Sequence, residues 1–278
     1  MRLVFLGTPE DAVPPLRALV AAGHEVALVV TQPDRKRGRG GALVPSPVRA
    51  TASELGLPVL TPARAGEVVE DVRASGADLG VIVAFGQLLP PSLLGALPLG
   101  FVNLHFSLLP RWRGAAPVER AILAGDAQTG VCVMAVEAAL DAGPVYARAS
   151  TPIDATETAG ELRARLVTLG TDLLVRTLPV FGTASPESQT GEPTYAAKLT
   201  VEEFRLDLAR PAAELLRVIR AGNPRPGAWL DLDGKRLKVL AAHVEAGQLV
   251  PDVVQPEGRG AMSIAAWRAG YRGPDPFG

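Results

Sequence analysis

The first thirty residues of the chain alternate between strand and helix patterns. Leu3 to Leu6 is an apolar run that ends at Gly7-Thr8-Pro9, and Val26 to Val30 is a second such run. Between them, residues 10–22 carry apolar side chains at helical spacing, and Gly23 ends the pattern. Strands that are apolar on both faces must be covered on both sides, so this unit predicts a mostly parallel sheet with helices on both faces.

This alternation continues to residue 181 and then stops. Asp78 to Phe85 is the strongest further strand pattern, and residues 158–181 carry a long helical one. The turn-forming stretch Gly182 to Pro193 predicts the end of a first domain. We expect a Rossmann-like α/β domain over residues 1–181, a linker over 182–204 and a small C-terminal domain over 205–278.

Composition and length exclude several classes of protein. The net charge is −1, so no overall charge attracts nucleic acid, and no segment reaches the roughly 18–20 apolar residues of a membrane span. The single cysteine, Cys132, lies in the apolar run Val131 to Met134, which favours a small buried hydrophobe over a reactive thiol. No spacing of His, Cys and carboxylates suggests a metal site. We therefore expect a cytoplasmic protein with no membrane partner and no metal.

An amide and an imidazole lie two residues apart at the end of a predicted strand. Residues 101–105 form that strand, and Asn103 and His105 project to the same side of it. Open α/β sheets bind ligands at the carboxyl ends of their strands, which makes the pair a candidate site. A structural histidine beside a turn accounts for His105 equally well. Asp141, in the turn Leu140 to Gly143, is by residue type more typical of turn formation than of catalysis.

Two loops could also bind a ligand. The segment from Ser107 to Pro117 holds Arg111, Trp112 and Arg113, and it is either a binding loop or a packed loop with Trp112 as its plug. The other loop follows the second strand and concentrates four cations in five positions, which suits contact with a phosphate backbone but also a solvated charge run. These cations are Arg35, Lys36, Arg37 and Arg39.

Taken together, these stretches resemble the formyltransferases that use 10-formyltetrahydrofolate. The signature is Asn103-x-His105-x-Ser107-Leu108-Leu109-Pro110 followed by Arg111-Trp112-Arg113-Gly114-Ala115-Ala116-Pro117, with Asp141-x-Gly143 further on. Thr31 to Arg35, then Gly38-Arg39-Gly40 and Pro45 to Val48, are similar to the loop of the branch that acts on tRNA. The resemblance covers almost the whole chain.

The resemblance implies a reaction and a role for each group of residues. A formyl group passes from 10-formyltetrahydrofolate to the α-amino group of methionyl-initiator tRNA through a tetrahedral intermediate. Asn103 and His105 would donate to its oxyanion, and Asp141 would hold the imidazole, favour its protonated form and help move the proton of the amine. We expect a monomer. The folate would contact Ser107, Leu108, Leu109, Pro110, Phe85, Gly86, Gln87 and Leu88, and the tRNA would contact Arg35, Lys36, Arg37 and Arg39.

The chain also departs from the family pattern. Phe106 stands where a small residue is usual, and Ala142 stands where Thr is usual. The family ends in an OB-like barrel of about five strands, whereas residues 227–255 have room for about three strands of ordinary length. Within them, Asp233-Gly234 predicts a β-hairpin turn. We expect a shortened OB-like domain, with weaker tRNA binding or tRNA binding through the basic loop alone.

Other activities fit parts of this pattern. An N-formyltransferase acting on an amino sugar nucleotide would share the three catalytic residues, but it would not need a long polycationic loop. A non-catalytic folate-binding protein would not need Asn103, His105 and Asp141 to be retained. A formyltransferase of purine synthesis would not need residues 200–278.

Overall fold

A computed structural model of the chain describes residues 1–37 and 41–278. The contacts between its residues form two compact units. Unit 1 holds Met1–Arg113, Gly130–Ser150 and Ala164–Thr194, and unit 2 holds Gly114–Thr129, Thr151–Arg163 and Tyr195–Gly278. The whole turn-forming stretch from Gly182 to Pro193 therefore groups with unit 1.

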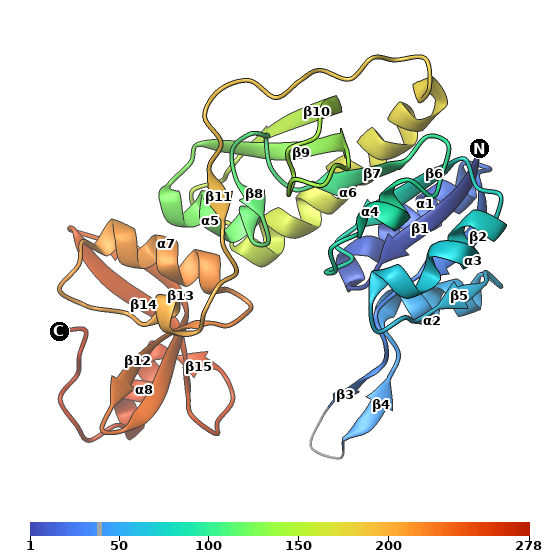
Figure 1. Cartoon of the computed structure of the whole chain (residues 1–278). Coiled ribbons are helices and arrows are strands. Elements are labelled where there is room, and N and C mark those ends of the chain that lie inside the picture. Colours follow the sequence, from blue (N-terminus) through green and yellow to red (C-terminus); the bar gives the residue numbers. More distant parts are fainter. Residues whose placement is uncertain (38–40) are drawn as a thin grey trace. The chain divides into compact units, whose positions relative to one another are not determined.

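A seven-stranded sheet forms the centre of unit 1 (Figure 1). Its order is β10-β9-β7-β6-β1-β2-β5, and the five strands from β5 to β7 are parallel. β9 runs antiparallel to its neighbour β7. This confirms the predicted Rossmann-like, mostly parallel sheet. The strands are Arg2–Gly7 (β1), Glu25–Val30 (β2), Val59–Leu60 (β5), Leu79–Val83 (β6), Phe101–His105 (β7), Gln128–Ala135 (β9) and Val145–Pro152 (β10).

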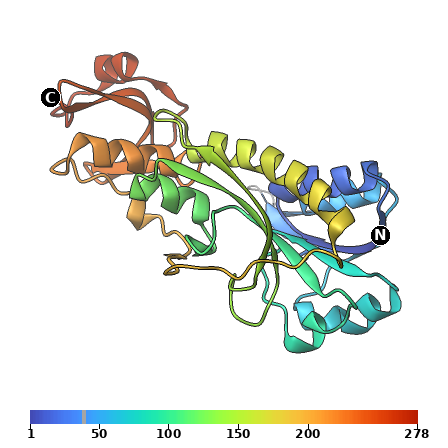
Figure 2. The same cartoon turned by 90° about the horizontal axis from the view of Figure 1, so that it is seen from above.

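Helices cover both faces of this sheet, as the strand composition requires. Seen from above, α1 and α6 lie on one face, and α3 and α4 lie on the other (Figure 2). The helices and helical turns are Glu10–Ala12 (η1), Val13–Ala21 (α1), Pro47–Glu54 (α2), Ala65–Val68 (η2), Val69–Ala74 (α3), Pro91–Leu94 (α4), Ala159–Thr177 (α6) and Leu178–Val180 (η3).

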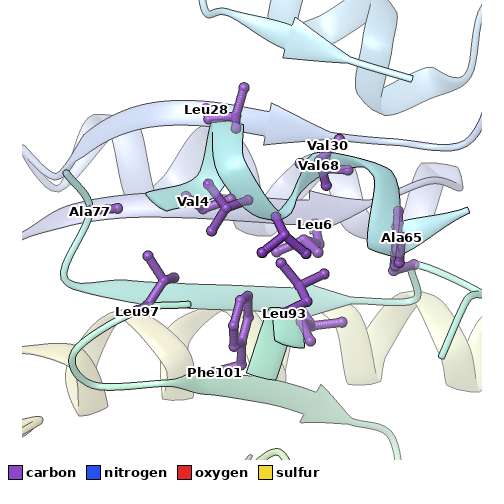
Figure 3. Packing of buried hydrophobic residues seen from close by; sticks show 14 residues of the cluster. Val4, Leu6, Leu28, Val30, Ala65, Val68, Ala77, Leu93, Leu97 and Phe101 are labelled. Carbon is purple, nitrogen blue, oxygen red and sulfur yellow. The ribbon is translucent and has the colours of Figure 1, made fainter. Parts of the chain in front are cut away.

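The buried cluster under α3 and α4 fixes which way the candidate residues point. Phe101 packs in this cluster with side chains of β1 and β2, including Val4, Leu6 and Val30 (Figure 3). Side chains of a strand alternate between faces, so Asn103 and His105 lie on the Phe101 side of β7. Leu104 points to the other face, where it packs against Gly170 of α6.

Gly80 of β6 lies directly beneath the ring of Phe101. A Cβ at Gly80 would overlap that ring. Gly80→Ala is therefore expected to lower the free energy of unfolding by about 1–3 kcal/mol, the usual cost of overpacking a core. Urea unfolding measures this. Gly95→Ala is the matched control, because its Cβ would meet nothing closer than 3.7 Å, and an equal loss in both variants would contradict the packing role.

The basic segment after β2 is not the irregular loop that its glycines suggest. Arg35–Arg37 (β3) pairs antiparallel with Ala42–Val44 (β4), and the hairpin extends away from the sheet (Figure 1). Its base is tied down: Thr31 and Ser46 share a buried hydrogen bond of 2.7 Å, and Arg49 pairs with Asp34. The backbone of Arg35 to Arg37 thus forms a strand and not an irregular loop.

Unit 2 is built around a four-stranded antiparallel sheet in the order β12-β13-β14-β15. β12 has five residues, β13 eleven, β14 nine and β15 two, and this small number of strands agrees with the expectation from the sequence. Asp233 and Gly234 both have positive φ in the predicted hairpin turn. The elements of unit 2 are Pro117–Ala124 (α5), Tyr195–Ala196 (β11), Glu202–Phe204 (η4), Ala212–Gly222 (α7), Ala228–Leu232 (β12), Lys235–Glu245 (β13), Gln248–Pro256 (β14), Met262–Ser263 (β15) and Ile264–Gly270 (α8). The short strand Arg113–Gly114 (β8) falls at the boundary in the chain between unit 1 and unit 2.

Among the described residues, no helix is both long enough and apolar enough to cross a membrane.

Candidate active site

His105 is the last residue of β7 and is almost completely buried. Its Nε2 lies 2.8 Å from the carbonyl oxygen of Trp112. A carbonyl can only accept a hydrogen bond, so Nε2 must carry a proton. The other ring nitrogen, Nδ1, faces Oδ2 of Asp141 at 3.8 Å, which is too long for a direct hydrogen bond. The ring is therefore fixed through Nε2, and Nδ1 lies beside a carboxylate.

Asp141 reaches His105 from the loop that follows β9. Its side chain is only 13% exposed, and its backbone lies in the left-handed region at φ 48°. Gly143 closes the same turn, and a Cβ at this position would overlap the carbonyl oxygen of Ala135. A glycine is thus required at position 143 for the turn to approach β9, and the turn gives Asp141 its position.

Asn103 lies two residues before His105 on the same face of β7. It pairs in register with Ile82 of β6 on one side and with Met134 of β9 on the other. The sequence predicted that this amide and the imidazole of His105 lie on the same face of one strand, and β7 holds them in that way. Two hydrogen-bond donors and one carboxylate therefore gather at this face of β7.

The four predicted folate residues in the loop after β7 differ in how deeply they are buried. Ser107 is fully buried, and its hydroxyl donates to the carbonyl of Arg111 at 2.6 Å. Leu109 packs in a small core with Cys132, Met134 and Val145. Only Leu108 and Pro110 are half-buried.

The loop after β6 is held by residues that sequence reasoning did not single out. Phe85 is buried, and its carbonyl accepts hydrogen bonds from Thr8 Oγ1 and Gln32 Nε2, each at 2.9 Å. A Cβ at Gly86 would lie only 2.6 Å from Gln32 Nε2. Thr8 directly follows β1, and ligands of open α/β sheets bind at the carboxyl ends of the strands. The position of Thr8 after this strand was the one sequence signal that could have identified it.

A cavity of about 810 Å³ opens beside this loop. Gly86, Gln87 and Leu88 line it, together with Gln32 and Arg35. Leu88 is 80% exposed, which leaves an apolar side chain available to a ligand. Three of the four folate residues predicted in this loop thus line one cavity. The fourth, Phe85, is buried and anchors the loop through its carbonyl.

The predicted tRNA residues lie on or next to the β3–β4 hairpin. Arg35 is exposed, and its guanidinium donates to Gln32 Oε1. Lys36 and Arg37 continue strand β3, and Arg39 lies outside the described residues.

In the part of the chain that the structure describes, possible metal ligands do not cluster, and the single cysteine is buried. The described residues contain no group of three or more His, Cys, Asp or Glu side chains that could hold a metal ion. Cys132 is fully buried, and burial raises the pKa of its thiol, which disfavours the reactive thiolate. The predicted buried hydrophobe at this position is confirmed.

The chain is similar to known proteins over most of its length. Residues 1–178 match the formyl transferase family, and residues 198–249 match the formyl transferase C-terminal domain. The methionyl-tRNA formyltransferase of Ruegeria pomeroyi is 48% identical, over 99% of this chain and 95% of its own length.

Solved structures share the fold at low sequence identity. The methionyl-tRNA formyltransferase of Clostridium thermocellum superimposes with a TM-score of 0.65 at 15% identity, over 94% of this chain and 100% of that one. HypX of Aquifex aeolicus, solved with tetrahydrofolic acid, gives a TM-score of 0.70 at 16% identity, over 96% of this chain and 46% of that one.

Proposed function

The chain belongs to the formyl transferase family, and we propose that it transfers a formyl group from 10-formyltetrahydrofolate to the α-amino group of methionyl-initiator tRNA. The observation that carries the proposal is the convergence of Asn103, His105 and Asp141 at one face of β7, with His105 Nδ1 beside the Asp141 carboxylate.

The proposed reaction exchanges one C–N bond for another. The amine nitrogen bonds to the formyl carbon, the carbonyl oxygen becomes an oxyanion, and the bond from that carbon to folate N10 then breaks. The amine loses one proton and N10 gains one, so charge and atoms balance. No step of this reaction requires a metal or a redox partner.

Each catalytic residue has a distinct task in this reaction. The amide of Asn103 and Nδ1–H of His105 donate to the oxyanion, because Nε2–H is already committed to the carbonyl of Trp112. When the ring carries both protons, the nearby Asp141 carboxylate stabilises its positive charge. The same carboxylate is the base nearest to the imidazole, so it can accept the proton that the attacking amine releases.

The folate is assigned to the loops after β6 and β7. Gly86, Gln87 and Leu88 offer a cavity wall, and Leu108 and Pro110 offer half-buried apolar surface. Ser107, Leu109 and Phe85 are buried, so we assign them the support of these loops rather than direct contact through their side chains.

The tRNA acceptor is favoured by cations in both units. In unit 1, Arg35 to Arg37 lie on the β3–β4 hairpin. In unit 2, a cavity of about 620 Å³ is lined by four cations and one carboxylate, which suits a polyanionic ligand. The residues are Arg163, Lys198, Arg225, Lys238 and Glu119. An amino sugar nucleotide has at most a few phosphate charges and would not need cations spread this widely.

One assay tests the proposal. Purified protein with 10-formyltetrahydrofolate is offered either methionyl-initiator tRNA or an amino sugar nucleotide, and the formylated product is measured. We expect formyl transfer to the tRNA and none to the sugar. Transfer to the sugar alone would establish the alternative acceptor. Folate binding without transfer to either acceptor would reject a catalytic role on these substrates.

A further inference from the structure

Gln189 contacts the turn that carries Asp141, although it lies 48 residues away in the chain. Its Nε2 donates to the carbonyl of Asp141 at 2.9 Å and to the carbonyl of Gly143 at 2.8 Å. A side-chain amide has two N–H donors, and both are used here on the two ends of one turn. The side chain of Gln189 therefore acts as a bridge across the turn.

Arg113 fixes the orientation of the Gln189 amide. Its Nε and Nη2 donate to Gln189 Oε1 at 3.0 and 2.6 Å. A guanidinium can only donate, so the amide oxygen must face Arg113 and the amide nitrogen must face the turn. Arg113 directly follows Trp112, whose carbonyl holds His105. One short segment thus contacts His105 on one side and Gln189 on the other.

The backbone around Gln189 is itself anchored to unit 1. Glu187 and Val145 exchange two backbone hydrogen bonds, of 2.7 and 2.9 Å. Thr194 accepts from the backbone N–H of Trp112 through Oγ1 and from that of Arg113 through its carbonyl, both at 2.9 Å. Gln189 lies between these two attachments, so its side chain is held against the Asp141 turn.

The turn needs such support. Asp141 has a positive φ, which an L-residue adopts at an energetic cost. Within the turn, the Ala142 N–H reaches the Ala139 carbonyl only at 3.3 Å. The bridge from Gln189 adds two shorter bonds to the residues on either side of Ala142.

We propose that Gln189, oriented by Arg113, is a positioning residue that holds Asp141 against His105. This inference rests on the proposed function, because it assigns Gln189 a role in the same reaction. Gln189 does not touch the reacting atoms and acts only through the turn. Sequence reasoning assigned it to a linker, because its neighbours are turn formers and nothing about a lone glutamine marks it as functional.

Gln189→Glu tests the proposal while keeping the size of the side chain and its pairing with Arg113. The new carboxylate has no N–H, so both bonds to the turn are lost. We expect kcat to fall about tenfold or more, since two hydrogen bonds of ordinary strength are removed, while the dissociation constant for folate stays within about threefold. Gln255→Glu is the matched control, because Gln255 also donates to a backbone carbonyl, that of Arg259, but in unit 2.

A double variant separates positioning from general support of the fold. In the Asp141→Asn background, Gln189→Glu should cost much less than it does alone, because the carboxylate that it positions is already absent. An equal loss in both backgrounds, or an unchanged kcat in the single variant, overturns the proposal.

A second measurement does not depend on activity. Hydrogen exchange over residues 136–144 should become faster in Gln189→Glu and stay unchanged in Gln255→Glu. Unchanged exchange in both variants would overturn the bridge even if the wild type transferred no formyl group. A wild type that is inactive on both acceptors, with faster exchange in Gln189→Glu, would instead reject the proposed function and keep the bridge.

Discussion

His105→Ala is expected to lower kcat for formyl transfer by about 10²- to 10³-fold, the usual cost of removing one donor to an oxyanion. The imidazole is also the group that lies beside the Asp141 carboxylate, so its loss removes both the donor and the partner of that carboxylate. The Gly86 to Leu88 wall of the folate cavity is held by Thr8 and Gln32, which donate to the carbonyl of Phe85. The dissociation constant for folate should therefore change by no more than a fewfold, measured by titration alongside single-turnover transfer.

The chain provides a matched control for this variant. His243 of β13 pairs with Asp252 of β14 at 3.0 Å, but both side chains are about half exposed. His243→Ala removes the same side chain from a similar pair and should leave kcat unchanged. If His105→Ala weakened folate binding as much as it slowed transfer, the ring would be part of the folate site rather than a donor to the oxyanion.

The sequence predicted the part of the site that depends on local periodicity. Asn103 and His105 share a face because they lie two apart on one strand, and that strand is recognisable from its apolar neighbours. The parallel sheet could be predicted equally well, because strands such as Val26 to Val30 are apolar on both faces.

Asp141 could not be placed by that reasoning. The rule that ligands meet the carboxyl ends of strands holds for parallel strands, and β9 is antiparallel to β7. Ala135, the last residue of β9, pairs with Val102 near the start of β7, so β9 ends away from His105. The segment 136–143, which follows β9, leads the chain back toward His105 and places Asp141 beside it. The family resemblance, rather than spacing, identified it.

Other features were missed because they depend on contacts between distant segments. Gln189 lies in a polar stretch whose composition indicates only a turn, and its partners are 46 to 76 residues away. The β3–β4 hairpin was hidden by its glycines and cations, which do not show the alternation of a buried strand. The burial of Leu109 depends on β9 and β10, which pack against a loop whose composition suggests a ligand-binding segment.

Asp141→Asn should produce a loss similar to that of His105→Ala, about 10²- to 10³-fold in kcat. The substitution keeps the size of the side chain and the turn, so it removes the negative charge beside Nδ1 and the nearest proton acceptor. Folate binding is again expected to stay within a fewfold. Asp252→Asn, the equivalent change in the exposed pair, is the control and should leave kcat unchanged.

The combination of the two variants tests whether the pair acts as a unit. If Asp141 serves the reaction through the imidazole, His105→Ala with Asp141→Asn should lose little more than either change alone, because groups that act together are strongly non-additive. Rates are measured in single turnover with saturating folate and tRNA. Multiplicative losses would mean that Asp141 acts on the amine without His105, which would make the carboxylate an independent base and leave the imidazole as a donor only.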